Sequence, residues 1–210
     1  MKKYKNLGIY GGTFAPVHKG HVESAKAFAR SGLIDTLFIM PAYLPPHKKL
    51  SFSDSPEARM EMLKIAFRDF YENSVDFQIS DYEIKKENVS YTYDTVSHFI
   101  KLCEKLILLC GADMFLSFDT WYRAPELMKT CEVAYIPRHN GQLKVLKDKA
   151  DELYERYGLI SHEIDAAVVD ISSSEIREKI KNGSDITDFV DADVEKYIKE
   201  KGLYDRFTES

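Results

Sequence analysis

Short apolar runs alternate with longer segments of helical period along the whole of the 210-residue chain. This alternation is typical of successive βα units and predicts an α/β fold with a doubly wound, mainly parallel sheet and helices on both faces. Strands are expected at residues 7–10, 36–40, 77–84, 106–109, 132–136 and 166–171, and helices at 20–31, from 56 onward, 92–105, 146–157, 173–181 and 191–201. Neither a repeat nor a linker divides the chain, so we expect one domain over residues 1–210 with a C-terminal helical portion from about residue 173.

Two segments between these elements differ from ordinary short connections. Residues 41–55 are too rich in proline for a helix or a strand and predict a long loop, a kind of segment that often has a function. Gly11 and Gly12 predict a tight turn between the first strand and the first helix.

Composition and charge narrow the class of protein. The chain has 44% hydrophobic and 30% charged residues, as ordinary globular proteins do. The formal net charge of −5 and the absence of a membrane-length apolar stretch predict neither nucleic acid nor a membrane as partner. The three cysteines, an odd number in apolar or mixed stretches, favour reduced thiols and a cytoplasmic location. The sequence leaves open whether a second copy of the chain is a partner in a homo-oligomer.

The first candidate site follows the first predicted strand, in Gly11-Gly12-Thr13-Phe14-Ala15-Pro16-Val17-His18-Lys19-Gly20-His21. Open α/β sheets bind ligands at such positions. The two glycines allow the main chain to approach a ligand, and the amides at the following helix start favour anionic oxygens. His18 and His21 are three apart, so both rings can face one phosphate group. A lone histidine there is more often structural, but the pair framed by glycines favours a phosphate site.

Other nucleotide signatures are missing from the sequence. Gly8, Gly11 and Gly12 do not make the dinucleotide fingerprint, and no glycine-rich stretch ends in Gly-Lys-Ser/Thr. An NAD-dependent oxidoreductase, the rival from another class of enzyme, predicts the fingerprint that is absent.

Residues 11–21 resemble the GGTFDPxHxGH signature of the nicotinate-nucleotide adenylyltransferases, within the HxGH nucleotidyltransferase superfamily. The second superfamily signature is matched by Ile171-Ser172-Ser173-Ser174-Glu175-Ile176-Arg177. A serine run after a strand often only caps a helix, but the two motifs occur here in the expected order. The resemblance implies a Rossmann-like fold and the transfer of adenylyl from ATP to nicotinate mononucleotide, giving deamido-NAD and pyrophosphate. Pro45-Pro46-His47-Lys48, Arg59-Met60, residues 90–95, Gly111-Ala112-Asp113 and Trp121 resemble the same branch.

The resemblance also implies roles for individual residues. Catalysis is expected from His18, His21 and Arg177. ATP would be bound by Gly11, Gly12, Thr13, Phe14, His18, His21, Gly111, Asp113, Ser172, Ser173 and Arg177. The mononucleotide would be bound by Thr13, His47, Lys48, Thr92, Trp121 and Tyr122, with Trp121 stacked on the pyridine ring. Magnesium is the expected cofactor and would arrive on the phosphates of ATP, without a metal ligand from the chain.

Ordinary structural roles compete with some of these assignments. Trp121 also fits a half-buried core position, Asp113 a helix cap, and Lys48 an exposed loop charge. The sequence also departs from the family at Ala15, where aspartate is usual, and at Ser174, where threonine is usual. Serine keeps the hydroxyl. The lost carboxylate should change loop anchoring or adenosine contacts more than the chemical step.

Several functions therefore remain open beside the main prediction. One is an adenylyltransferase that prefers nicotinamide mononucleotide, phosphopantetheine or a cytidylyl acceptor; chain length and Trp121 argue against phosphopantetheine. Another is a non-catalytic nucleotide-binding module of the same fold, for which Ala15 is the support.

Overall fold

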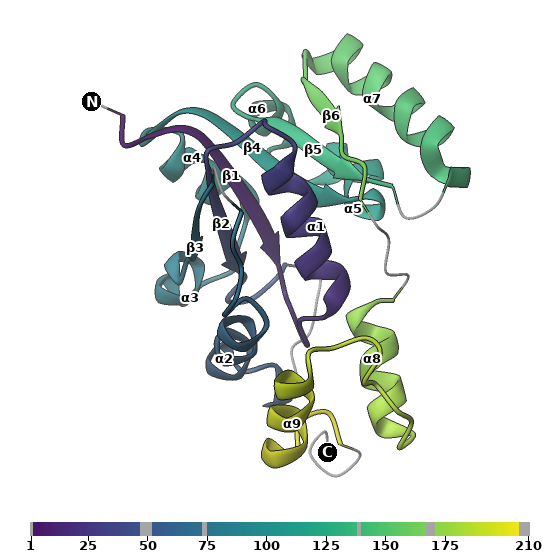
Figure 1. Cartoon of the computed structure of the whole chain (residues 1–210). Helices are drawn as coiled ribbons and strands as arrows, with labels where there is room; N and C mark the ends of the chain where they lie inside the picture. The colour runs from purple at the N-terminus through teal and green to yellow at the C-terminus, as the bar shows by residue number, and fades with distance from the viewer. Residues whose placement is uncertain (1, 47–51, 73–74, 138–139, 167–170, 206–210) are drawn as a thin grey trace.

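A single parallel sheet organises the structure, a computed structural model that describes residues 2–46, 52–72, 75–137, 140–166 and 171–205. Within these residues six strands lie in the order β3-β2-β1-β4-β5-β6, and all five pairings are parallel (Figure 1). The strands are β1 (Tyr4–Gly12), β2 (Thr36–Pro41), β3 (Asp76–Ile79), β4 (Cys103–Gly111), β5 (Glu132–Ile136) and β6 (Ser161–Glu163). The predicted α/β class and parallel sheet are confirmed.

Helices connect the strands, and their ends follow local sequence signals. They are α1 (Lys19–Arg30), α2 (Pro56–Ala66), α3 (Tyr82–Lys86), α4 (Thr92–Phe99), α5 (Ala112–Leu116), α6 (Ala124–Met128), α7 (Leu143–Tyr157), α8 (Ser173–Lys181) and α9 (Ala192–Lys201), with 3-10 turns η1 (Phe52–Asp54), η2 (Phe118–Thr120) and η3 (Asn140–Gln142). Pro56 begins α2 as predicted, because Ser55 accepts a hydrogen bond from the Ala58 amide and a helix start needs no amide from proline. No helix in the described residues is long and apolar enough to cross a membrane.

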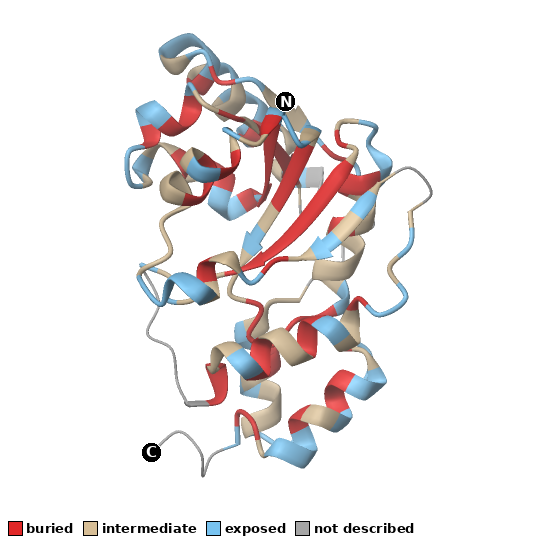
Figure 2. Cartoon of the chain, turned by 90° about the vertical axis from the view of Figure 1, so that its left-hand side faces the viewer, coloured by how far each residue is buried: buried red, intermediate tan, exposed pale blue. Residues whose placement is uncertain are grey.

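The sheet separates two hydrophobic clusters because side chains alternate along each strand. In β4, Ile107 and Leu109 face the cluster that contains residues of α1, α2, α8 and α9. Leu106 and Leu108 face the other cluster, which contains residues of α4, α5, α6 and α7. Figure 2 shows the buried central strands between helices whose outer faces are exposed. Burial on both faces explains why 106–109 is a continuous apolar run.

The strand order changes direction between β1 and β4. From β1 the chain proceeds to β2 and β3 on one side of the sheet, and β4 then starts the other half beside β1. Ligands of open α/β sheets bind outside the carboxyl ends of the strands at such a switch point. Tyr10 of β1 pairs with Leu109 of β4, so Gly11 and Gly111 both lie just beyond that pair. The predicted first site and the predicted Gly111-Ala112-Asp113 segment therefore adjoin. Helices α8 and α9 lie at the end of the molecule toward which β1 and β2 point (Figure 1).

Two predicted element boundaries were wrong in the middle of the chain. The expected strand 77–84 ends at Ile79, and α3 follows; Ser80 and Asp81 turn the chain, and the Lys85 amide bonds to the Asp81 carbonyl. Apolar residues two apart in this short helix imitate strand alternation. The expected helix 92–105 ends at Phe99, because Cys103 pairs with Tyr4 in the sheet.

One further local prediction was wrong. Gly11 and Gly12 do not form a tight turn: they are the last two residues of β1, paired with Met40 and Pro41 of β2. The sequence also did not predict β6. Of the predicted strand 166–171, residues 167–170 lie outside the described residues, and the flanking Ala166 and Ile171 belong to no strand.

Candidate active site

The end of β1 is shaped for close approach by a ligand. A Cβ atom on Gly11 or on Gly111 would meet no protein atom within 4 Å, so no neighbour in the described structure requires glycine at either position. Gly12 differs, because a Cβ there would lie 2.9 Å from the ring of Phe14. Open space above two neighbouring strand ends favours a ligand whose atoms pass close to the main chain.

The loop that follows β1 is held through its own carbonyl groups by side chains from two other helices. Arg59 of α2 donates to the Thr13 carbonyl at 3.1 Å. Arg177 of α8 donates to the Ala15 carbonyl at 2.7 Å, and Ser173 of α8 donates to the Pro16 carbonyl at 3.0 Å. Backbone acceptors thus anchor the loop although residue 15 has no carboxylate. The two sequence motifs meet here, more than 150 residues apart in the chain.

His18 and His21 form a stacked pair at the start of α1. His18 is the N-cap residue, and the two ring centroids lie 3.6 Å apart with an interplanar angle of 33°. The His18 amide donates to Nδ1 of His21 at 3.2 Å. An accepting Nδ1 places the ring proton of a neutral His21 on Nε2, which is then a donor. The ring of Phe14 packs edge-on against the ring of His21, with their centroids 5.0 Å apart.

The serine-rich motif makes both a helix cap and a link to the loop. Ser172 is the N-cap of α8: its hydroxyl lies 2.6 Å from Oε2 of Glu175 and accepts from the Glu175 amide at 3.2 Å. The capping role that serines commonly have is therefore present for Ser172. Ser174 accepts from Nη2 of Arg177 at 3.1 Å, a contact that needs only the hydroxyl that serine and threonine share. Arg177 is thereby held between its own helix and the Ala15 carbonyl.

Three of the predicted mononucleotide residues, Thr92, Trp121 and Tyr122, lie beside aromatic rings. Trp121 is half-buried and packs against Phe118 at a centroid distance of 4.7 Å. Tyr122 is 53% exposed, and its ring lies 4.5 Å from that of Tyr91, the residue before Thr92 at the start of α4. Thr92 and Tyr122 are therefore neighbours through Tyr91. His47 and Lys48 lie outside the described residues.

An ion pair supports the turn that carries Trp121. Lys149 of α7 bonds to Asp119 of η2 at 2.9 Å and to Glu152 at 3.1 Å. The hydrogen bond from Lys149 holds the pKa of Asp119 below its usual range. Asp113, one of the predicted ATP-binding residues, is exposed in the first turn of α5.

No activated thiol stands at this edge of the sheet among the described residues. Cys110 immediately precedes Gly111, and burial raises the pKa of its thiol to about 12. It is therefore protonated near neutral pH and unsuited as a nucleophile. All three cysteines are buried and free, as the sequence predicts.

Two buried charged residues near the site were missed by sequence reasoning. Arg59 is fully buried, whereas the sequence gave it no role beyond its resemblance to the family. Its spacing of three and four residues from the buried Met62 and Leu63 of α2 placed it on the inner face of that helix, and this signal could have found it. Glu83 of α3 is 8% exposed and accepts from the Thr95 hydroxyl of α4. Burial raises the pKa of this carboxyl, against the opposing hydrogen bonds from Thr95 and Ser90.

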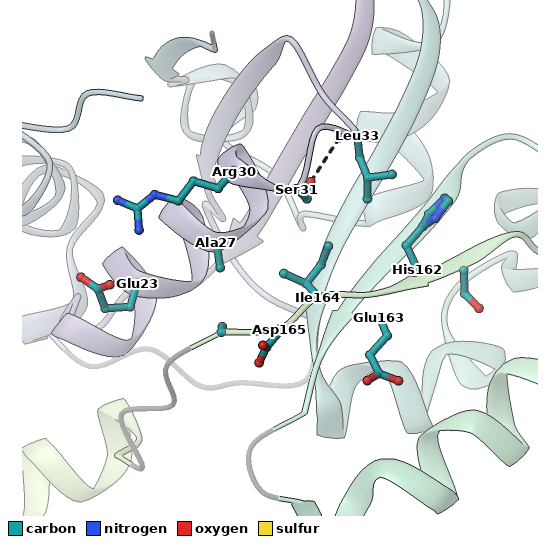
Figure 3. Close-up of a pocket in the computed structure, with 11 residues that line it drawn as sticks. Glu23, Ala27, Arg30, Ser31, Leu33, His162, Glu163, Ile164 and Asp165 are labelled. Carbon is teal, nitrogen blue, oxygen red and sulfur yellow. Dashed lines mark hydrogen bonds between the residues drawn. The ribbon is translucent and has the colours of Figure 1, made fainter. Parts of the chain in front are cut away.

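An open groove of about 680 Å³ lies elsewhere, between α1 and β6. Figure 3 shows α1 forming one wall, and β6 with the residues after it the other. Three carboxylates line it, from Glu23, Glu163 and Asp165, and its Arg30 is paired with Glu72 at 2.7 Å. None of the predicted site residues lines this groove, and its acidic walls are unsuited to a triphosphate.

Comparisons with known proteins show the family and the fold of the chain. Residues 9–179 match the model of the family described as cytidylyltransferase-like. A probable nicotinate-nucleotide adenylyltransferase of Caldicellulosiruptor saccharolyticus is 35% identical over 198 residues, which cover 94% of this chain and 98% of the relative. One of Clostridium botulinum is 34% identical over 204 residues, covering 97% and 98%. The solved nicotinic acid mononucleotide adenylyltransferase of Plasmodium falciparum, complexed with NaAD, shares the fold with a TM-score of 0.77, 18% identity and coverage of 96% and 98%.

Proposed function

Because the chain belongs to the nicotinate-nucleotide adenylyltransferases, within the cytidylyltransferase-like family, we propose that His18, His21 and Arg177 carry the adenylyl transfer for which that family is named. The enzyme joins the adenylyl group of ATP to the phosphate of nicotinate mononucleotide, giving deamido-NAD and pyrophosphate. One observation supports this most strongly: Arg177 and Ser173 of the second motif bond to the loop between Gly12 and His18. The residues expected to hold a triphosphate are thus assembled at the switch point of the sheet.

The reaction needs no covalent intermediate on the enzyme. The attacking mononucleotide phosphate is already an anion, so catalysis consists of holding two polyanions in line and stabilising the charge that develops on the phosphoryl oxygens. We assign the donation to those oxygens to Nε2 of His21, because Nδ1 of this ring accepts from the His18 amide. A guanidinium has five N–H donors, and the contacts of Arg177 with Ala15 and Ser174 use two, so others can meet phosphate oxygens.

Magnesium is assigned to the substrate rather than to the chain. Among the described residues no group of three or more His, Cys, Asp and Glu side chains is arranged to hold a metal ion. We assign magnesium to the phosphates of ATP, where it neutralises charge. The three free, buried cysteines support a cytoplasmic location.

Selection between nicotinate and nicotinamide is the finer part of the proposal. Thr92 begins α4 beside Tyr91 and Tyr122, and the amides of a helix start favour an anion by about 0.3–1 kcal/mol. That difference corresponds to only about a two- to fivefold preference for the nicotinate carboxylate. Direct hydrogen bonds must supply the rest of any strict selection. Preference for nicotinamide mononucleotide is therefore the second candidate.

Pyrophosphate release from ATP and magnesium tests the proposal, with nicotinate mononucleotide, nicotinamide mononucleotide and phosphopantetheine supplied separately at equal concentration. We expect release mainly with the nicotinate form, and a loss of turnover of about a hundredfold in His18→Ala. His98→Ala is the matched control, because His98 stacks on Tyr82 outside the site and should keep normal turnover. ATP binding without release from any acceptor would instead support a non-catalytic module, with Ala15 as the leading cause.

A further inference from the structure

Arg59 uses its guanidinium entirely inside the protein and on backbone carbonyls. The side chain is 0% exposed. Nε donates to the Asp54 carbonyl at 2.8 Å, and Nη2 donates to the Tyr43 carbonyl at 3.2 Å. Nη1 donates to the Thr13 carbonyl at 3.1 Å and to the Ala42 carbonyl at 2.6 Å. One planar group thus contacts three separate segments of the chain.

Two of those segments leave neighbouring strands at the edge where the site lies. Thr13 follows β1, and Ala42 follows β2. The Ala42 amide also donates to the Gly12 carbonyl at 2.9 Å, so the two segments are joined by a backbone bond beside the guanidinium. The third segment is η1, which leads into the helix that carries Arg59 itself. The arginine therefore bridges the segments that leave the two strands.

Hydrogen bonds continue from Arg59 to the other predicted half of the site. The Tyr43 amide donates to the Ser90 hydroxyl at 2.9 Å, and the Ser90 amide donates to the Leu44 carbonyl at 2.9 Å. Ser90 lies two residues before Thr92, in the segment that begins α4. A continuous set of bonds thus connects the loop at Thr13 with the turn at Thr92.

We infer that Arg59 is a positioning residue that fixes the ATP half-site relative to the mononucleotide half-site. This inference rests on the proposed function, which assigns Thr13 to ATP and to the mononucleotide and Thr92 to the mononucleotide. In-line transfer requires the two reacting groups at near-attack distance, and a misplacement of about 1 Å can reduce the rate about a hundredfold. Arginine suits the task because its rigid fork spans several acceptors, whereas the lysine ammonium is a compact charge on a flexible stem.

Two carboxylates act on the charge of Arg59. Burial lowers the pKa of the guanidinium, and the carboxylates of Asp54 and Glu57 oppose that change. Arginine remains charged in proteins, and lysine replaces its planar fork with a single ammonium on a stem of similar length. Arg59→Lys therefore removes the fork while it keeps most of the side-chain volume.

The test compares Arg59→Lys with Arg68→Lys in the full chain, at a temperature where circular dichroism shows both folded. Arg68 follows the same helix but is exposed and paired with Asp191 and Asp193 of the α9 region, so it is the matched control. We expect kcat of Arg59→Lys to fall about tenfold or more, with the KM of each substrate changed by less than about threefold. Isothermal titration should show normal ATP affinity and about tenfold weaker binding of deamido-NAD, which must span both half-sites. Arg68→Lys should keep all of these values.

Ser90→Ala provides a second route if Arg59→Lys does not fold. It removes the acceptor of the Tyr43 amide and so interrupts the same set of bonds without altering Arg59. We expect a smaller change in the same direction, in kcat and in deamido-NAD affinity. If Arg59→Lys folds and keeps normal kcat and normal deamido-NAD affinity, the inference is overturned and Arg59 has only a structural role. If Arg59→Lys does not fold, the same result in Ser90→Ala overturns the inference. A wild-type chain that neither releases pyrophosphate nor binds deamido-NAD would instead contradict the proposed function itself.

Discussion

In the proposed function the two ring nitrogens of His21 have separate roles, and two substitutions can divide them. Nδ1 accepts from the His18 amide at 3.2 Å and so supports the start of α1, whereas Nε2 is the proposed donor to the reacting phosphate. The oxygen of asparagine lies near the position of Nδ1, and the amide nitrogen of glutamine near that of Nε2. His21→Asn should therefore keep the helix cap and lose the donor. His21→Gln should do the reverse.

The expected magnitudes follow from the interactions that each substitution removes. Loss of one transition-state donor costs about 2.7–4 kcal/mol, which lowers kcat of His21→Asn about a hundred- to a thousandfold. Both variants lose the ring packing against His18 and Phe14, worth about 0.5–1.5 kcal/mol, and His21→Gln also loses a hydrogen bond worth about 1 kcal/mol. For a chain of this size each kcal/mol lowers Tm by about 2–4 °C.

The two variants should consequently fall in opposite orders in two assays. In thermal unfolding, wild type should have the highest Tm, His21→Asn the next and His21→Gln the lowest. In pyrophosphate release, wild type should be fastest, His21→Gln slower and His21→Asn slowest. Turnover of His21→Asn within about threefold of wild type would refute the donor role of Nε2. The same order in both assays would show that activity only follows stability.

Two further predictions concern the cap of α8 and the buried carboxyl of α3. Ser172→Ala should lower the unfolding free energy by about 1 kcal/mol, measured by urea denaturation, because the hydroxyl that accepts from the Glu175 amide is lost; no change would contradict the capping role. For Glu83, whose pKa burial raises, the folded chain retains a proton that the unfolded chain releases from about pH 4 upward. The unfolding free energy of wild type relative to that of Glu83→Gln should therefore be greatest below about pH 4 and decline as pH rises through the folded pKa. A difference in unfolding free energy that stays constant between about pH 3 and 8 would exclude this titration.

Local sequence patterns predicted most elements because the chain itself carries their signals. The apolar run at 106–109 and the helix start at Pro56 can be recognised without knowledge of the fold, and both elements were found in the structure. The boundary error at 92–105 arose where distant pairing decided the outcome. Cys103 belongs to a strand only because Tyr4 lies beside it in the sheet.

The sequence by itself determined the α/β class, the order of the two motifs and the family, since periodicity and motif spacing are properties of the chain. Tertiary structure alone decided how the predicted residues are held. Arg177 bonds to Ala15 and Ser173 to Pro16 because folding brings α8 against the loop after β1. Arg59 occupies a fully buried position, where four carbonyls from three segments converge on its charge. Convergence of segments distant in sequence is a property of packing, and no local pattern contains it.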